Sequence, residues 1–348
     1  MSASPQLPND LIKATSRSFY LTLRVLPGGI RPQIGLAYLL ARTSDTIADT
    51  EIVSAEQRLS ALELLRGRIL ESHRKPLDFG ELAKRQGLPA ERVLLERCEE
   101  SLSVLDGFNS ADQQRIRQVL ETIISGQVLD LRRFSGASVA KIVSLPTDEE
   151  LDDYTYRVAG CVGEFWTNMC RTHLFPGAAL DEKQLLADGV RFGKGLQLVN
   201  ILCDLPADLR QGRCYLPAGP LAAAGLTPEQ LLDPKNEEKF RPLYNRYLAK
   251  AEEHLTAGWA YTNAVPRRCV RVRLACAWPV LFGVKTLGKL RTGNVLDPQK
   301  RIKISRPEVK GVIWRTVLYY PCQPAWRRLF GSSGGGSRKA VASPGNFK

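Results

Sequence analysis

The sequence predicts an all-α protein that folds as a single domain. Three observations support this: apolar residues recur at three- and four-residue spacing, capping residues precede these segments, and Pro and Gly separate them. With 348 residues, 44% of them hydrophobic and 24% charged, the chain can bury a sizeable core, although length alone would also allow two domains. We expect the domain to span residues 1–330 and the Gly- and Ser-rich residues 331–348 to form a disordered tail.

Helices are expected over residues 35–50, 54–70, 111–134 and 179–202, where strong helix formers lie between the apolar residues. Ser54 and Gln57 form a capping-box pair before the second of these helices, and Ser110 is the expected N-cap of the third. The segments PGG (27–29), FPG (175–177) and LPAGP (216–220) are typical of turns between helices. No alternating strand pattern of useful length and no internal repeat is present.

The net charge of +13 is confined to the last quarter of the chain. Residues 266–348 carry 18 Lys and Arg against two acidic residues, which leaves −3 for residues 1–265. Such asymmetry indicates a surface for phosphate, nucleic acid or anionic lipid. Since no arginine–glycine or zinc-knuckle pattern is present, we expect no nucleic-acid partner.

The basic quarter predicts a peripheral membrane surface over residues 267–328. Trp314, Tyr319, Tyr320 and Trp326 are its expected interfacial aromatic residues. The alternative is a solvated basic face with these aromatic residues in the core behind it.

The remaining composition predicts a reduced, cytoplasmic chain that contacts the inner face of a membrane only peripherally. The eight cysteines contain no C-x-x-C, and the first residues lack the basic and apolar regions of a signal peptide. His73, His173 and His254 lie far apart, so no local zinc motif exists. The most apolar run, 274–284, is broken by Pro279 and is shorter than the ~20 residues that span a bilayer.

Two pairs of aspartates carry the expected chemistry. Asp45 and Asp49 are four residues apart, which places both carboxylates on one helix face, and Asp204 and Asp208 repeat that spacing. Each pair lies in an otherwise apolar helix, where an unpaired buried charge is costly, so a neutralising cation is expected. Hard oxygen ligands suit Mg²⁺, which prefers one or two carboxylates together with substrate phosphates. The implied substrate is a diphosphate.

Polar and basic residues flank both pairs. Arg42 lies one turn before the first pair, either as a surface salt-bridge partner or as a forked donor to phosphate oxygens. The other flanking residues are Ser16, Ser18, Phe19 and Tyr38 near the first pair, and Gln197, Asn200, Arg210 and Arg213 near the second.

Four segments together resemble the squalene and phytoene synthase family: SRSFYLTLRVLP (16–27), YLLARTSDTIADT (38–50), YTYRVAGCVGEFW (154–166) and GLQLVNILCDLPADLRQGRCYLP (195–217). Their order and intervals match the family over about residues 10–300. The resemblance implies the isoprenoid synthase fold of class I terpenoid synthases, with a central cavity and the two aspartate motifs facing each other at its mouth.

The resemblance also implies a reaction. Members of this family join two prenyl diphosphates head to head, with Mg²⁺ assisting the departure of one diphosphate, and form a cyclopropylcarbinyl diphosphate. Squalene synthases reduce its rearranged cation with NADPH, whereas phytoene synthases lose a proton. The stretch DLPADLRQGRCYLP favours squalene from farnesyl diphosphate. Phytoene from geranylgeranyl diphosphate, hydroxysqualene, and a non-catalytic assembly factor with the same fold are the alternatives.

Carried over by position, the resemblance assigns metal binding to both aspartate pairs and Asn200. Tyr154 would assist proton removal or steady the cation, and Gly160 and Gly163 would keep the cavity wall free of side chains. Catalytic roles fall to Asp45, Asp49, Tyr154, Asp204, Asp208 and Arg42. Substrate-binding roles fall to Ser16, Ser18, Phe19, Tyr38, Arg42, Gln197, Asn200 and Arg213.

This chain departs from the family pattern at two positions. Cys203 stands where many members have a basic residue, which puts diphosphate or NADPH contacts there in doubt. Pro206 lies between Asp204 and Asp208, where its ring and missing N–H would kink a helix.

Overall fold

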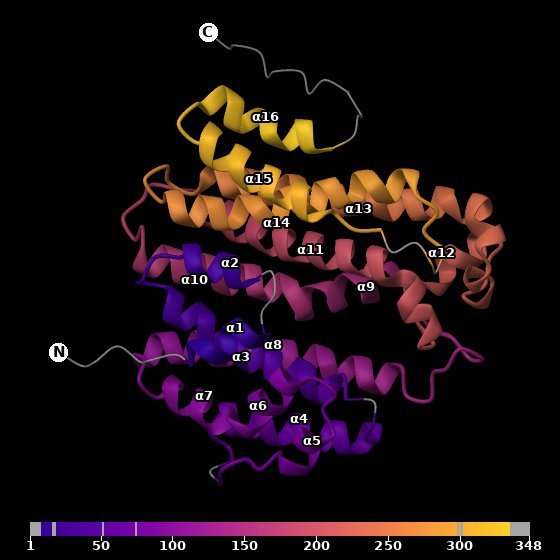
Figure 1. Ribbon diagram of the computed structural model, residues 1–348, viewed down its shortest axis with the longest axis horizontal. Coiled ribbons are helices and arrows are strands. Elements are labelled where there is room, and N and C mark those ends of the chain that lie inside the picture. Colours follow the sequence, from indigo (N-terminus) through magenta and orange to yellow (C-terminus); the bar gives the residue numbers. More distant parts are fainter. Residues whose placement is uncertain are drawn as a thin grey trace.

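The computed structural model describes residues 8–15, 19–50, 52–73, 75–297, 299 and 302–334, without the side chains of Asn9 and Phe19. The described chain is almost entirely helical, as the sequence predicts (Figure 1). The first part contains α1 (Asn9–Thr15), α2 (Phe19–Val25), α3 (Arg31–Ala48), α4 (Ala55–Ile69), α5 (Gly80–Lys84), α6 (Pro89–Glu96), α7 (Cys98–Leu105) and α8 (Ser110–Arg133).

The second part contains the longest helices. These elements are β1 (Val143–Leu145), α9 (Asp148–Thr155), the π-helix η1 (Tyr156–Gly160), α10 (Cys161–His173), α11 (Glu182–Arg210), β2 (Arg213–Pro217), α12 (Ala218–Ala223), the 3₁₀ turns η2 (Glu229–Leu232) and η3 (Pro234–Asn236), α13 (Glu237–Ala264), α14 (Val270–Thr292), α15 (Arg306–Tyr319) and α16 (Gln323–Ser333). β1 and β2 form a short parallel pair, in which Val143 lies opposite Arg213. The alternation of this pair is too short to be seen in the sequence.

All four predicted helices form; the first three are shifted slightly at their ends, and the fourth continues eight residues further, to Arg210. The predicted segments correspond to α3, α4, α8 and α11, and Ser54 and Gln57 make the expected capping box. The prediction that Ser110 caps α8 is wrong by one residue, because the Asn109 side chain accepts the Asp112 N–H at 2.9 Å. Residues 216–220 form the end of β2 and the start of α12 rather than a turn between helices.

α11 is the central helix of the molecule. It packs along α13 and also contacts α10, α14, η1 and β2 (Figure 1). On the other side of the cavity described below, α8 packs against both α3 and α4. Three apolar clusters fill the interior. The first joins α1–α8 and α10 to parts of α11, α13 and α14, the second surrounds α11, α13 and β2, and the third lies between α13, α14, α15 and α16.

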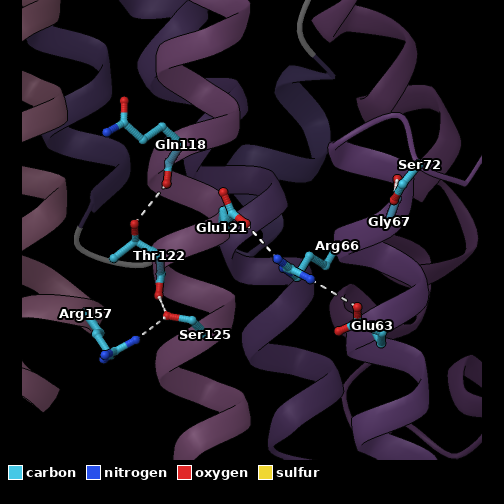
Figure 2. Close-up of polar contacts among 9 residues, drawn as sticks. All are labelled: Glu63, Arg66, Gly67, Ser72, Gln118, Glu121, Thr122, Ser125 and Arg157. Atoms are coloured by element: carbon cyan, nitrogen blue, oxygen red, sulfur yellow. Dashed lines mark hydrogen bonds and ion pairs between the residues drawn. The ribbon is translucent and has the colours of Figure 1, made fainter.

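Polar contacts hold α8 to its neighbours on two sides (Figure 2). On one side, the Arg66 guanidinium of α4 lies 2.7 Å from Glu121 of α8 and 3.1 Å from Glu63 of its own helix. On the other side, the Arg157 guanidinium of η1 donates to the Ser125 hydroxyl at 3.0 Å. These contacts fix the rotation and height of α8, which carries three of the residues that line the cavity described below.

Two of the four predicted interfacial aromatic residues are wholly or partly buried in the C-terminal helices. Trp326 is fully buried and stacks on Trp259, with ring centroids 5.3 Å apart. Tyr320 is half-buried, and its hydroxyl donates to the Arg267 carbonyl at 2.6 Å. Trp326 is therefore not accessible to a membrane, Tyr320 is only partly accessible, and Trp314 and Tyr319 are exposed.

The predicted domain boundary at residue 330 falls inside α16, which continues to Ser333. The predicted disordered tail lies outside the described residues from 335 onward and stays a prediction. The apolar run at 274–284 forms the buried middle of α14. Across the described residues, no helix combines the length and apolarity needed to cross a bilayer.

Candidate active site

A cavity of about 630 Å³ opens between α3, α8, η1, α11 and β2. A second hollow of about 460 Å³ adjoins it and shares with it Asp49, Tyr154, Gln197, Gln211, Arg213 and Tyr215. Both predicted aspartate pairs face this combined space, although they are far apart in the sequence. The cavity therefore lies where the predicted chemistry requires it.

The first aspartate pair occupies the last turn of α3. Asp49 is the exposed C-cap residue and lies on both hollows, where a negative charge opposes the helix dipole. Asp45 accepts a hydrogen bond from the Gln127 side chain of α8. Burial and the neighbouring Asp49 charge raise the pKa of Asp45 to about 6. The charge of Arg42 and the Gln127 hydrogen bond lower this pKa but do not outweigh the effect of burial.

The second pair lies on α11. Asp204 and Asp208 line the smaller hollow together with Asn200 and Gln197. Burial and the charge of Asp204 raise the pKa of Asp208 to about 7. The negative charges of Asp49 and Asp130 also raise the pKa of Asp208, so carboxylates of the two pairs interact electrostatically across the cavity.

Pro206 does not end α11, which continues to Arg210. A proline at this position removes the N–H that would bond the carbonyl four residues earlier, that of Leu202. The buried hydroxyl of Tyr244 on α13 donates to this carbonyl at 2.9 Å and replaces the missing donor. The carboxylates on either side of Pro206 therefore remain on one continuous helix.

Asp130 on α8 is a third acidic element that our sequence analysis missed. It lines the larger hollow and accepts a hydrogen bond of 2.6 Å from the Tyr215 hydroxyl. Its other oxygen is buried and has no hydrogen-bond partner among the described residues. Burial raises the pKa of Asp130 to about 6. The sequence offers one indication of this position, because Gln127 is a polar residue on the apolar face of α8, one turn before Asp130.

Tyr154 is buried at the junction of both hollows and stacks on Tyr215, with ring centroids 4.8 Å apart. Burial first, and then the charge of Asp130, raise the pKa of Tyr154 well above its ordinary value. The π-helix η1 begins two residues later, and such wide turns often occur at functional sites. The raised pKa keeps the Tyr154 hydroxyl neutral throughout the physiological pH range.

β2 brings a cation and an aromatic ring to the same cavity. Arg213 and Tyr215 are two residues apart, so their side chains leave the strand on the same face. Gly212 makes this geometry possible, because its φ is +79° and a Cβ there would lie 2.3 Å from the Ser138 backbone nitrogen. The Arg213 charge lowers the pKa of both Asp208 and Asp130, so it lies among the carboxylates.

Two further arginines border the larger hollow. Arg58 of α4 donates to the Ala48 carbonyl at 2.9 Å, at the end of the helix that carries the first pair. Arg210 donates to the Pro206 carbonyl at 2.5 Å, at the end of the helix that carries the second pair. An anion that bridges the two aspartate pairs would thus meet guanidinium groups at both ends.

Several predicted site residues lie elsewhere. Arg42 forms an ion pair of 2.6 Å with Glu91 and is not among the residues that line either hollow. The Tyr38 hydroxyl donates to the Thr15 carbonyl at 3.2 Å, away from the lining. Their catalytic and substrate-binding roles stay predictions. Ser16 and Ser18 lie outside the described residues, as does the side chain of Phe19 at the start of α2.

Gly160 and Gly163 are not among the residues that line either hollow, and their role in a cavity wall stays a prediction. A Cβ on Gly163 would lie 1.9 Å from the Gly189 carbonyl oxygen, and one on Gly160 would lie 3.0 Å from the Tyr156 ring. Both glycines therefore serve helix packing, and Gly163 permits the close approach of α10 and α11. Cys203 packs against the second apolar cluster instead of facing the cavity.

The donor set fits a hard divalent cation bound jointly with phosphate oxygens. No three His, Cys, Asp or Glu side chains of the described residues converge closely enough to form a metal site by themselves. Around the cavity stand five aspartates, three of which have raised pKa values, and Asp130 has an oxygen without a donor. Mg²⁺ suits this arrangement, since it prefers few carboxylates and completes its octahedron with waters and phosphates.

Comparison with known proteins agrees with this geometry. A family described as squalene/phytoene synthase matches residues 12–308. A bifunctional lycopene cyclase/phytoene synthase of Gibberella fujikuroi is 30% identical over 251 residues, which cover 70% of this chain and 40% of that protein. The chain thus spans about two fifths of the length of this curated relative.

Solved structures share the fold. TcSQS in complex with the ligand E5700 has a TM-score of 0.76 at 21% identity, covering 93% of this chain and 88% of that chain. The squalene synthase HpnC from Alicyclobacillus acidocaldarius has a TM-score of 0.59 at 19% identity, covering 82% of this chain and 92% of that chain. The prediction of an all-α isoprenoid synthase fold is confirmed.

Proposed function

Because this chain belongs to the squalene/phytoene synthase family, we propose that it condenses two prenyl diphosphates head to head. One observation carries the proposal: five aspartates from α3, α8 and α11 face one cavity together with Arg213 and Tyr154. Opposed carboxylates with nearby guanidinium groups suit a diphosphate that leaves with its charge neutralised. The family uses a divalent metal to bind prenyl diphosphates.

In this proposal both aspartate pairs, with Asn200 beside the second, hold Mg²⁺. The metal would supply positive charge that stabilises the departing diphosphate. Arg213 lies on both hollows and donates to diphosphate oxygens as a forked cation, with Arg58 and Arg210 at the border of the larger hollow. Gln127 orients Asp45 toward the cavity.

Tyr154 stabilises the carbocation in this proposal and does not act as a phenolate. Its raised pKa keeps the hydroxyl neutral, so its ring face and oxygen lone pairs are what a passing cation meets. Stacking on Tyr215, whose hydroxyl is held by Asp130, fixes the ring in place. Of the two roles that the family resemblance suggested for this tyrosine, this environment favours steadying the cation.

We favour farnesyl diphosphate as the substrate and squalene as the product, formed through presqualene diphosphate. Loss of the first diphosphate gives an allylic cation that adds to the double bond of the second molecule, and loss of a proton closes the cyclopropane. Ionisation of the second diphosphate and rearrangement then require a hydride, which NADPH would donate. The stretch DLPADLRQGRCYLP supports this choice through its family resemblance.

Phytoene formation from geranylgeranyl diphosphate is the second candidate. It is favoured by the curated relatives, which are named bifunctional lycopene cyclase/phytoene synthases and are 30% and 31% identical to this chain. The last cation would then lose a proton and need no NADPH. Capture of water at the same stage would give hydroxysqualene.

The test is product analysis by mass spectrometry after incubation of the purified protein with Mg²⁺ and either farnesyl or geranylgeranyl diphosphate, each with and without NADPH. A C30 hydrocarbon that requires NADPH supports squalene synthesis, C40 phytoene without NADPH supports the second candidate, and a C30 alcohol supports hydroxysqualene. No condensation of either substrate would overturn the proposal in favour of a non-catalytic assembly factor.

Matched variants connect the product to the cavity. Asp45→Asn and Asp204→Asn should each lower turnover at least about a hundredfold with unchanged helical content, because each removes a charge that holds the cation. Asp106→Asn, at the exposed end of α7 and outside the cavity, is the control and should keep full activity. Full activity of either cavity variant would refute the metal assignment.

A further inference from the structure

The exposed face of α15 carries an apolar stripe that no other part of the described chain covers. Trp314 is 73% exposed, Leu318 63% and Val317 51%, although the helix buries Val312 and Thr316 on its opposite side. Positions 314, 317, 318 and 321 follow helical spacing, so Pro321 extends the same stripe beyond the helix end. A large exposed apolar patch of this kind marks an interaction site.

The inner face of α15 is firmly attached, so the stripe is not a loosely packed core helix. The Trp278 indole N–H donates to the buried Thr316 hydroxyl at 2.9 Å, and Val312 belongs to the third apolar cluster. A capping box of Ser305 and Glu308 fixes the start of the helix. The outward direction of Trp314 and Leu318 therefore follows from a well-anchored helix.

Basic side chains surround the stripe and have no acidic partners among the described residues. Exposed cations on α15 and α16 are Arg306, Lys310, Arg315, Arg327 and Arg328. The one nearby acid, Glu308, is 2.7 Å from Lys289 and is already neutralised. Arg267 borders the far end of the stripe, where its guanidinium donates to the Pro321 carbonyl at 3.3 Å. By contrast, half-buried arginines near α4–α7 are paired with glutamates, as are Arg66 of α4 and Arg97, which lies between α6 and α7.

We propose that the outer face of α15, with Trp314, Val317 and Leu318 at its centre and the surrounding arginines and lysines, docks this protein on an anionic lipid bilayer. Interfacial helices combine these features: apolar and aromatic groups that enter the headgroup region and basic groups that meet lipid phosphates. A second copy of the chain fits less well. A twofold contact through this face would bring the same cations of both copies together.

Docking would place the protein beside the lipid bilayer, into which a water-insoluble hydrocarbon product partitions. α15 and α16 lie at the end of the molecule opposite α4–α7 (Figure 1), so the surface and the acidic cavity are separate features. The docking proposal does not depend on the identity of the substrate, and its test uses no substrate.

Co-sedimentation of the full-length protein with phospholipid vesicles tests the surface. Vesicles of phosphatidylcholine with about a third phosphatidylglycerol should bind the protein, while phosphatidylcholine alone should bind it at least about tenfold less, since basic residues are attracted to anionic headgroups. Raising the salt concentration should release the protein, because the attraction to anionic headgroups is screened.

Variants separate the stripe from a general charge effect. The double variant Trp314→Ser with Leu318→Ser should lose about tenfold or more in vesicle affinity, and Lys310→Gln with Arg315→Gln should lose a similar factor. The apolar control, Ile52→Ser with Leu88→Ser, removes exposed side chains next to α4 and α6. It should bind as well as the wild type, and circular dichroism should show that all variants are folded.

Tryptophan fluorescence locates the contact. Trp259, Trp278 and Trp326 are buried, whereas Trp314 is exposed, so lipids with brominated acyl chains should quench a signal that Trp314→Phe removes. Failure to bind anionic vesicles at low salt would overturn the proposal. So would equal binding by wild type and the stripe variant, or light scattering that shows a dimer abolished by Trp314→Ser.

Discussion

Three carboxyl groups around the cavity are harder to ionise than ordinary aspartates. Burial is the largest cause at Asp45, Asp130 and Asp208, and it raises the pKa values to about 6, 6 and 7. A carboxyl with a raised pKa in the folded state stabilises the protein while it is protonated and loses that contribution as the pH rises through this pKa. Near neutral pH, ionisation of these buried carboxyl groups therefore lowers the free energy of unfolding of the ligand-free protein.

We expect Asp208→Asn to stabilise the ligand-free protein at high pH but not at low pH. Both proteins carry a neutral side chain at pH 5, whereas at pH 8 only the wild type has an ionised Asp208 facing Asp204. The melting temperature of the variant relative to wild type should rise between these pH values, as measured by calorimetry in the presence of a chelator. A difference that does not vary with pH would contradict the assigned pKa.

Tyr154→Phe tests the role of a neutral hydroxyl beside the cation. The ring and its stacking on Tyr215 remain, so the fold and substrate binding should be preserved. We expect kcat to fall about ten- to a hundredfold with little change in KM, because the lost interaction is strongest with the charged transition state. Steady-state kinetics measures both values. Tyr261→Phe, at a buried hydroxyl bonded to Thr167 away from the cavity, is the control.

At the scale of the element, α11 depends on contacts with neighbouring helices, one of which compensates for the proline inside it. Pro206 removes a backbone donor, and Tyr244 of α13 supplies a replacement at the Leu202 carbonyl. On the opposite side, Gly163 lets α10 approach the Gly189 backbone. The helix that carries the second aspartate pair thus stays continuous through Pro206 and packs closely against its neighbours.

Tyr244→Phe should destabilise the protein by about 1–3 kcal/mol, because it leaves the Leu202 carbonyl buried without a donor. The same substitution in a Pro206→Ala background should cost clearly less, since alanine restores the backbone N–H. Urea denaturation of the four proteins in this double-mutant cycle gives the coupling free energy. Equal costs in both backgrounds would show that the Tyr244 hydroxyl does not replace the missing donor.

Gly163→Ala should also destabilise the protein, by about 1–3 kcal/mol or more, since its methyl group would collide with the Gly189 carbonyl. Gly177→Ala, where a Cβ meets nothing within 4 Å, is the matched control and should be nearly neutral. The denaturation midpoints of the two variants, compared with that of the wild type, measure both changes in stability. If Gly163→Ala retained full stability but lost activity, the glycine would belong to the cavity wall after all.

At the scale of the whole molecule, the cavity lies between helices that pack into two different apolar clusters. Asp45 and Asp49 belong to α3 beside the first cluster, and Asp204 and Asp208 belong to α11 beside the second. Mutual repulsion of these carboxylates weakens the junction, and a cation shared with a diphosphate should strengthen it.

Mg²⁺ and inorganic diphosphate together should therefore raise the melting temperature by on the order of 5 °C. A ligand at a hundred times its Kd adds about 2.7 kcal/mol to stability. Mg²⁺ or diphosphate alone should have a much smaller effect, because each leaves the opposite charge uncompensated. Thermal unfolding followed by circular dichroism measures the shift. Asp204→Asn should abolish the joint effect, and an undiminished shift in that variant would place the ligand elsewhere.

Local sequence determined the helices and the geometry within each aspartate pair. Apolar spacing located α3, α4, α8 and α11, and a separation of four residues fixes Asp45 relative to Asp49 because the pitch of a helix is the same everywhere. That both pairs face one cavity was implied by the family resemblance and not by any local pattern. The local predictions succeeded because each depends on a short stretch of chain.

Only the tertiary structure decided which distant residues meet. It brought Asp130 and Tyr215 to the cavity, paired Arg42 with Glu91, and set Tyr244 against the carbonyl that Pro206 leaves free. It also buried Trp326 while leaving Trp314 exposed, although both lie in equally basic sequence. The physical reason is that hydrogen bonds and burial depend on how helices pack, and helix packing is set by side chains far apart in the sequence.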